Sequence, residues 1–161
     1  MKYLNKFNLS EKNAIIVGGA GLIGKEITIA LSESGANVTV IDINKSPVDE
    51  IIDKYNFSNI SFEKLDLENI DKLESNFKKI LKKIDKLDIF INCSYPRPKI
   101  QGKKSFDHIE FNYFRKIVDM QLNSFCWLAK MAAQKMKRSN NPGSIVQFSS
   151  IYGVVGQNLN I

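Results

Sequence analysis

Three glycines near the start of the chain have the spacing of a phosphate-binding turn. Gly18, Gly21 and Gly24 follow the β-branched run 14–17 and open a stretch with helical apolar spacing, which predicts a strand, a tight turn and a helix. The first glycine permits the bend, the second lets backbone approach a diphosphate, and the third allows close helix packing. The free N–H groups of the helix, with Leu22 and Ile23 in its first turn, would bind phosphate. A purely structural turn is the alternative.

An acidic residue follows at the distance that a dinucleotide site needs. The predicted strand 37–41 ends at Asp42, about 20 residues past the glycine turn, and Ile43 lies beside it. A carboxylate in this place binds ribose hydroxyl groups in dinucleotide-binding units. Glycine spacing alone is a weak signal, but the strand, the helix and this acid together predict a dinucleotide site.

The elements that must position these residues alternate along the chain. We expect residues 1–11 to form a lead-in and residues 12–161 to form one NAD(P)-binding domain that is incomplete at its C-terminus, with a long helix predicted at 109–138. Strands and helices in alternation predict an α/β fold: a Rossmann-like doubly wound parallel sheet with helices on both faces and strand order 3-2-1-4-5. The predicted strands are 14–17, 37–41, 59–65, 87–91 and 144–148.

Composition excludes several classes of protein. Of the 161 residues, 43% are hydrophobic and 25% charged, an ordinary globular balance. No apolar run reaches the ~20 residues of a membrane helix, and the first residues lack the apolar stretch of a signal peptide. Cys93 and Cys126 have no metal-ligand spacing, so we predict free thiols, a cytoplasmic location and no metal site.

The net charge of +6 does not indicate nucleic acid. Lysines concentrate in the segment 72–86, where apolar residues recur at helical spacing, so the lysines occupy the solvent face of an amphipathic helix. Aromatic residues do not alternate with the basic ones as they do on single-strand binding surfaces. We therefore predict neither a nucleic-acid nor a membrane partner.

Five features in order resemble the short-chain dehydrogenase/reductase family, from about Lys12 to the last residue. They are the glycine turn, Asp42, Asp66-Leu67 after the third strand, Asn92-Cys93-Ser94 after the fourth, and the run Gly143-Ser144-Ile145-Val146-Gln147-Phe148-Ser149-Ser150. The resemblance implies hydride transfer between a nicotinamide and a carbonyl or alcohol carbon. In that family a tyrosine transfers the proton, a lysine lowers its pKa, and a serine binds the substrate oxygen.

The resemblance also implies roles for individual residues. Ser150 falls where the family has its serine, although a turn-capping role is the alternative. Gln121, rather than Asn123, falls where the family has an active-site asparagine, and a structural bond from Gln121 to backbone is its alternative. Side chains two positions apart on a helix point in directions that differ by roughly 200°, so Gln121 and Asn123 cannot both face the site.

The remaining implied residues would surround the cofactor. Asp66 would bind the adenine amino group and Leu67 the ring edge, with a helix N-cap as the alternative for Asp66. Asn92 would lie beneath the nicotinamide ribose, next to Cys93 and Ser94. Asp42 would repel the 2′-phosphate of NADP by roughly 4 kcal/mol at ~4 Å and an effective dielectric near 20. NAD is therefore the expected cofactor, although Lys45 could soften this repulsion.

One family feature is absent from the sequence. No Tyr-x-x-x-Lys follows Ser150, and the two prolines in Tyr95-Pro96-Arg97-Pro98-Lys99 prevent that match from forming a helix. We expect the chain to be the N-terminal part of a longer enzyme, inactive by itself, with strand 144–148 as an exposed edge and Met120, Trp127 and Met131 uncovered. The alternatives are a non-catalytic dinucleotide-binding regulatory module and, from the glycine spacing, an extended-branch sugar epimerase or dehydratase.

Two short stretches bear on the substrate. Asn92–Arg97 and Ser149–Val155 resemble the branch that modifies flagellin or surface sugars, which implies a sugar derivative as the small-molecule substrate. Arg97 could bind a phosphate or carboxylate with both arms of its guanidinium, or stand unpaired on the surface. The long helix resembles the family's dimerisation helix, so a homo-oligomer is expected for the full-length protein.

Overall fold

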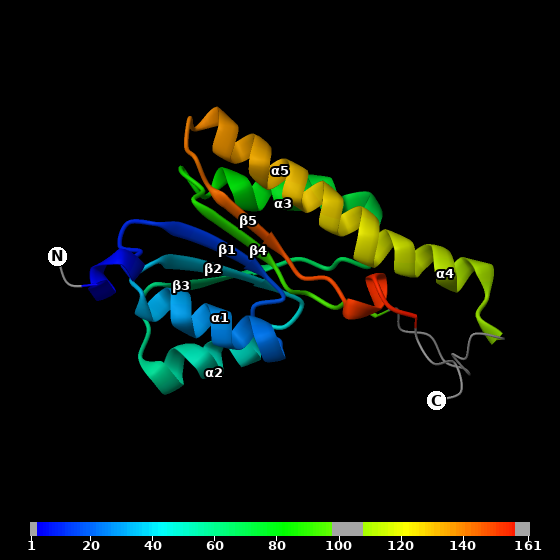
Figure 1. Ribbon diagram of the computed structural model, residues 1–161, viewed down its shortest axis with the longest axis horizontal. Coiled ribbons are helices and arrows are strands. Elements are labelled where there is room, and N and C mark those ends of the chain that lie inside the picture. The colour runs from blue at the N-terminus through cyan, green and yellow to red at the C-terminus, as the bar shows by residue number, and fades with distance from the viewer. Residues whose placement is uncertain (1–2, 98–107, 157–161) are drawn as a thin grey trace.

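Five parallel strands form one sheet in the order β3-β2-β1-β4-β5 (Figure 1). The computed structural model describes residues 3–97 and 108–156. The strands are β1 Asn13–Val17, β2 Asn37–Asp42, β3 Ile60–Lys64, β4 Ile89–Asn92 and β5 Ser144–Gln147. The predicted fold class and strand order are confirmed.

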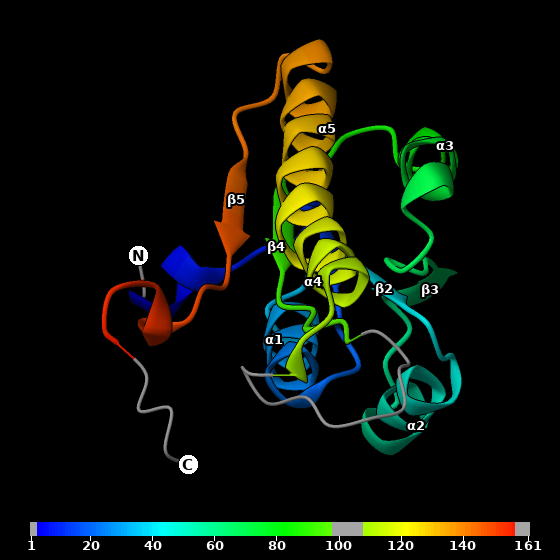
Figure 2. The ribbon, with the colours of Figure 1, turned by 90° about the vertical axis from the view of Figure 1, so that its right-hand side faces the viewer.

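Helices cover both faces of the sheet because the central strand is apolar on both sides. Ala14 and Ile16 of β1 belong to the core beneath α1 (Leu22–Glu33) and α2 (Ser46–Tyr55). Ile15 and Val17 belong to the opposite core, beneath α3 (Ile70–Lys82) and α5 (Ser124–Arg138). Figures 1 and 2 show the two helical layers with the sheet between them. None of the described helices is both long and apolar enough to span a membrane.

The long predicted helix forms, but one turn of it is wider than an α-helical turn. Residues Phe111–Ile117 make α4, Val118–Asn123 make a π-helical segment, and α5 continues to Arg138. A π turn bonds i to i+5 and often lies at functional sites. The sequence pattern did not predict this segment, which lies beside the cavity described below.

The last strand is exposed, as predicted, but the long helix is better covered than predicted. Ile145 and Val146 of β5 are 39% and 45% exposed, and Trp127 of α5 is 39% exposed. The prediction for Met120 and Met131 was wrong, because they are only 4% and 6% exposed. Met131 packs in the core shared with α3, which covers this side of α5.

Candidate functional site

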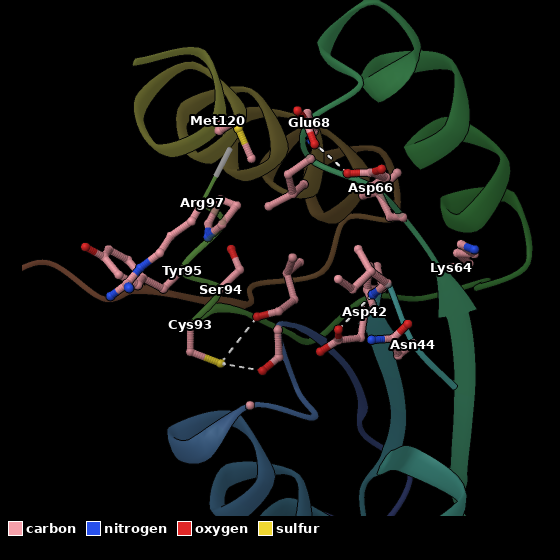
Figure 3. A pocket seen from close by; sticks show the side chains of 18 of the residues that line it. Asp42, Asn44, Lys64, Asp66, Glu68, Cys93, Ser94, Tyr95, Arg97 and Met120 are labelled. Carbon is pink, nitrogen blue, oxygen red and sulfur yellow. Dashed lines mark hydrogen bonds between the residues drawn. The ribbon is translucent and has the colours of Figure 1, made fainter. Parts of the chain in front are cut away.

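A cavity of about 700 Å³ opens at the carboxyl edge of the sheet (Figure 3). Strands β1, β2, β3 and β4 all end at this cavity, as expected for a ligand site on an open parallel sheet. The lining residues are Val17, Gly18, Gly21, Leu22, Ile23, Ile41, Asp42, Ile43, Asn44, Lys64, Leu65, Asp66, Leu67, Glu68, Cys93, Ser94, Tyr95, Pro96, Arg97 and Met120. Ten of the twelve predicted cofactor residues belong to this set, and the other two, Gly24 and Asn92, lie outside it.

The glycine turn has the geometry that its sequence predicts. Gly18 adopts a left-handed φ of +74°, and its N–H donates to Ile41 O at 2.8 Å. Gly24 does not line the cavity: a Cβ there would lie 2.0 Å from Gly18 O, so Gly24 allows the helix to pack on the turn. Gly21 is the N-cap of α1 and offers no side-chain bond. The first N–H groups of α1 therefore remain for solvent or ligand.

Asp42 is held by backbone donors, and its carboxylate lines the cavity. Its Oδ2 accepts from Ala20 N at 3.2 Å and its Oδ1 from Ile43 N at 2.7 Å. Each carboxylate oxygen has a further lone pair, so the group can still accept hydrogen bonds from a ligand. Lys45 forms an ion pair with Asp49, whereas Lys64 is the lysine that lines this cavity among residues 3–97 and 108–156.

Asp66 and Leu67 lie at the same end of the cavity as Asp42. Asp66 Oδ1 accepts from Glu68 N at 2.9 Å, which fixes the turn before α3. The N-cap of α3 is Asn69, so Asp66 is not the helix cap considered as an alternative. Leu67 is buried in the core while it lines the cavity, so it offers an apolar wall to a ligand.

The residues after β4 divide between the core and the cavity. Asn92 is fully buried and does not line the cavity; its Oδ1 accepts from Ser94 Oγ at 2.7 Å. Its Nδ2 has no hydrogen-bond partner within the part of the chain that the structure describes. Cys93 Sγ lies 3.3 Å from Val17 O. Burial, with a smaller contribution from the charge of Asp42, raises the pKa of Cys93 to about 11, so this thiol is protonated at neutral pH.

The two predicted catalytic residues are not brought together at the cavity. Ser150 is exposed, lies outside the cavity lining, and its Oγ accepts from Tyr152 N at 3.2 Å at the start of a short 3₁₀ turn, Ile151–Gly153. Gln121 Nε2 donates to Pro96 O at 3.0 Å. Asn123 instead bonds Asp119 at 2.7 Å on the exposed side of the helix. The two alternatives considered for Ser150 and Gln121, a turn cap and a backbone bond, are therefore the contacts observed.

Several lining residues were not predicted from the sequence. They are Asn44, Lys64, Leu65, Glu68 and Met120, besides the strand residues Val17 and Ile41. Most of them directly follow or end a strand of the sheet, which is the signal that could have found them. Met120 comes from the unpredicted π-helical segment. No cluster of three potential metal ligands occurs among the described residues.

Comparison with known proteins connects this cavity to a family. The model described as short chain dehydrogenase matches residues 12–161. The short chain dehydrogenase/reductase dpfgG of Gibberella zeae is 29% identical over 145 residues, covering 89% of this chain and 53% of that protein. Post-translational flagellin modification protein A of Campylobacter coli is 25% identical over 150 residues, covering 91% and 58%. An NAD-dependent glycerol dehydrogenase of Listeria innocua is 28% identical over 152 residues, covering 92% and 56%.

Solved structures have the same fold. A hydroxysteroid dehydrogenase from Escherichia coli matches 91% of this chain and 61% of its own, with a TM-score of 0.72 and 28% identity. A gluconate 5-dehydrogenase from Burkholderia cenocepacia, solved with NADP and tartrate, matches 96% and 59%, with a TM-score of 0.77 and 19% identity. The chain spans about half the length of the curated relatives it matches. On the family match and these likenesses together, the chain belongs to the short-chain dehydrogenase/reductase family.

Proposed function

We propose that this chain binds NAD and supplies the cofactor site of an oxidoreductase that transfers a hydride between nicotinamide and a carbonyl or alcohol carbon. One observation carries the proposal: the uncapped start of α1 and the carboxylate of Asp42 line the same cavity. A diphosphate needs the first, and a ribose with two free hydroxyl groups fits the second.

The residues present fit a dinucleotide along the carboxyl edge. Gly21, Leu22 and Ile23 would hold the diphosphate through backbone N–H groups, while Asp42 and Ile43 would bind the adenosine ribose. Asp66 and Leu67 would bind adenine, and Cys93 and Ser94 would lie towards the nicotinamide. Gly18 would line the site at the turn itself, whereas Gly24 and Asn92, which lie outside the cavity lining, would support it from behind.

Asp42 favours NAD over NADP. The fold alone does not distinguish NAD from NADP, because one relative is an NAD-dependent glycerol dehydrogenase and a solved structure of the same fold holds NADP. Lys45, which could have offset the acid, is paired with Asp49. Even about 1.4 kcal/mol of repulsion between Asp42 and a 2′-phosphate corresponds to tenfold weaker binding.

Catalysis by this chain's residues would centre on Ser150. Its oxygen accepts from Tyr152 N, so its own O–H remains able to donate to a substrate oxygen. Bound NAD would supply the hydride chemistry. The 161 residues contain no Tyr-x-x-x-Lys after Ser150, so we propose that this chain binds cofactor without turning over substrate unless that pair is supplied.

The proposed substrate class is a sugar derivative. The support is the resemblance of the sequence around Tyr95 and Tyr152 to the flagellin-modifying branch, and a relative named post-translational flagellin modification protein A. Two free cysteines support a reducing, cytoplasmic location. We further propose that the full-length protein forms a homo-oligomer through the long helix.

Fluorescence titration of the 161-residue chain with NADH and NADPH tests the cofactor. We expect NADH to bind at least about tenfold more tightly than NADPH, and Asp42→Asn to reduce this difference to about twofold. Asp53→Asn, an exposed acid on α2, is the matched control and should leave both affinities unchanged. Equal affinities of the wild-type chain for the two cofactors would contradict the assignment of NAD.

A further inference from the structure

The segment that leaves β4 is bonded to the long helix. This exit segment, Tyr95–Arg97, lines the cavity with all three of its residues. Gln121 Nε2 donates to Pro96 O at 3.0 Å across 25 residues of sequence. Pro96 has no N–H of its own, so its carbonyl is the polar backbone group through which this position can be held.

The π-helical segment presents Gln121 to the exit segment. Met120, its neighbour in the same segment, is 4% exposed and lines the cavity. Ser124 Oγ donates to Met120 O at 2.5 Å, which adds a side-chain bond to the widened turn. Asn123 points elsewhere and bonds Asp119. One amide hydrogen of Gln121 is thus used to fix the exit segment.

Arg97 is the cationic group on the exit segment. Its guanidinium carbon lies over the Tyr95 ring, 4.7 Å from the ring centroid, at cation–π distance. Within residues 3–97 and 108–156, no carboxylate lies within ion-pair distance of Arg97. Figure 3 shows Arg97 and Tyr95 at one end of the cavity and Asp42 at the other. The cavity is therefore acidic at its β2 end and cationic at its β4 end.

We infer that Arg97 binds an anionic group, a phosphate or a carboxylate, at the β4 end of the cavity, and that Gln121 is a positioning residue that holds Arg97 there through Pro96. The planar guanidinium of Arg97, which lies over the Tyr95 ring, can bind such a group with two parallel hydrogen bonds. The inference rests on the proposed function, because the anion belongs either to the cofactor's diphosphate or to the acid group of a second ligand.

Substitution of Arg97 tests the anion site and identifies its source. The wild-type chain, Arg97→Gln and the control Arg115→Gln are titrated with NADH, adenosine and inorganic phosphate. Arg115 is matched to Arg97, since its guanidinium carbon lies 5.9 Å from the ring of Phe111 on exposed α4. Circular dichroism checks that all three chains are folded.

Two results support the inference and one overturns it. If the anion is the cofactor's diphosphate, Arg97→Gln weakens NADH about tenfold and leaves adenosine unchanged. If it belongs to a second ligand, Arg97→Gln leaves NADH unchanged but weakens phosphate about tenfold on the NADH-saturated chain. No change in either titration overturns the inference. Failure of the wild-type chain to bind NADH would instead refute the proposed function. Titration of the chain with phosphate in the absence of NADH would still test the anion site at Arg97.

A double-mutant cycle tests the role of Gln121. Gln121→Met keeps the length of the side chain but removes the donor to Pro96. If Gln121 acts through Arg97, Gln121→Met weakens the same probe as Arg97→Gln, and the double variant is no weaker than Arg97→Gln alone. Asn123→Ala, two residues away, is the control and should leave binding unchanged. Additive losses in the double variant would show that Gln121 does not position Arg97.

Discussion

Two aspartates at opposite edges of the same sheet show how differently a carboxylate can be used. Asp88 immediately precedes β4 at the amino edge, and Asp42 ends β2 at the carboxyl edge. Asp88 is 4% exposed and Asp42 is partly exposed. The difference lies in the groups that surround each of them.

Asp88 is enclosed by donors from three parts of the chain. Its Oδ2 accepts from Asn13 N at 3.1 Å, and its Oδ1 accepts from Asn141 Nδ2 at 3.2 Å and lies 3.3 Å from both Lys12 Nζ and Lys86 Nζ. Burial acts to raise the pKa of Asp88, but these hydrogen bonds outweigh it and the pKa is lowered. Asp88 thus ties the starts of β1, β4 and β5 together.

Asp42 has two backbone donors and an open side. Its remaining lone pairs face a cavity, which is how a ligand can replace water without breaking a protein contact. The two residues differ in that the carboxylate of Asp88 is enclosed by protein donors and serves stability, whereas the carboxylate of Asp42 keeps acceptors for a ligand. Four changes would test or refine this contrast.

Gly24→Ala should have the largest effect. The added Cβ would lie 2.0 Å from Gly18 O and 2.8 Å from Gly19 Cα, so backbone must move and the cost should exceed about 3 kcal/mol. Urea denaturation measures the loss. Gly153→Ala is the control, because the nearest atom to its Cβ is Ser149 Oγ at 3.9 Å. A Gly24→Ala chain as stable as Gly153→Ala would refute this account of the turn.

Asp88→Ala should destabilise the chain more than Asp42→Ala. Removing Asp88 leaves buried donors without a partner, at a cost of about 2–3 kcal/mol. Removing Asp42 exposes two backbone N–H groups to a cavity that water can enter, so we expect a cost below about 1 kcal/mol. If the two variants lost the same free energy of unfolding, Asp88 and Asp42 would not differ in their contribution to stability.

Low pH should remove the contribution of the Asp88 carboxylate to the free energy of unfolding. Because its folded-state pKa lies below the ordinary value of 3.8, the charged carboxylate stabilises the fold above about pH 4, and this stabilisation is lost as pH falls through the folded pKa. The gap in unfolding free energy between the wild-type chain and Asp88→Asn should therefore narrow as pH is lowered from 5 towards 3. If this difference in unfolding free energy widened over this range, the pKa of Asp88 would be raised in the folded state rather than lowered.

The smallest effect concerns the two thiols. Cys126 is exposed, whereas burial raises the pKa of Cys93 to about 11. The thiolate is the reactive species, so at pH 8 a disulfide reagent should modify Cys126 quickly and Cys93 slowly. Cys126→Ser should abolish the fast phase without changing stability by more than about 0.5 kcal/mol. A fast phase that persists in Cys126→Ser would show that Cys93 is ionised.

Regular patterns predicted the fold and much of the cavity. Alternating strands and helices give the strand order, and the glycine turn with Asp42 gives the centre of the cavity, because these depend on backbone sterics and chain connection. The same reasoning predicted a tight turn at Gly18, and this glycine adopts a left-handed φ of +74° in the structure.

Partners of individual side chains could not be predicted in the same way. Lys45 has Asp49 one helical turn away and pairs with it rather than with Asp42. Gln121 finds its partner 25 residues back, and the burial of Met120 and Met131 depends on the rotation of a long helix. In each case the side chain could form several contacts of similar energy, and the packing of the folded chain determines which contact forms.

The extra residue in the Val118–Asn123 turn has a consequence for how this helix can change over generations. An α-helix advances about 100° per residue, so one residue added at ordinary pitch would rotate everything beyond it. The wider turn takes up that residue, and Leu128 and Met131 keep their places in the interior. Loss of one residue from this turn, with a return to ordinary pitch, would therefore keep the same face of α5 inward, whereas loss of one residue elsewhere in α4 would turn Leu128 and Met131 away from the core.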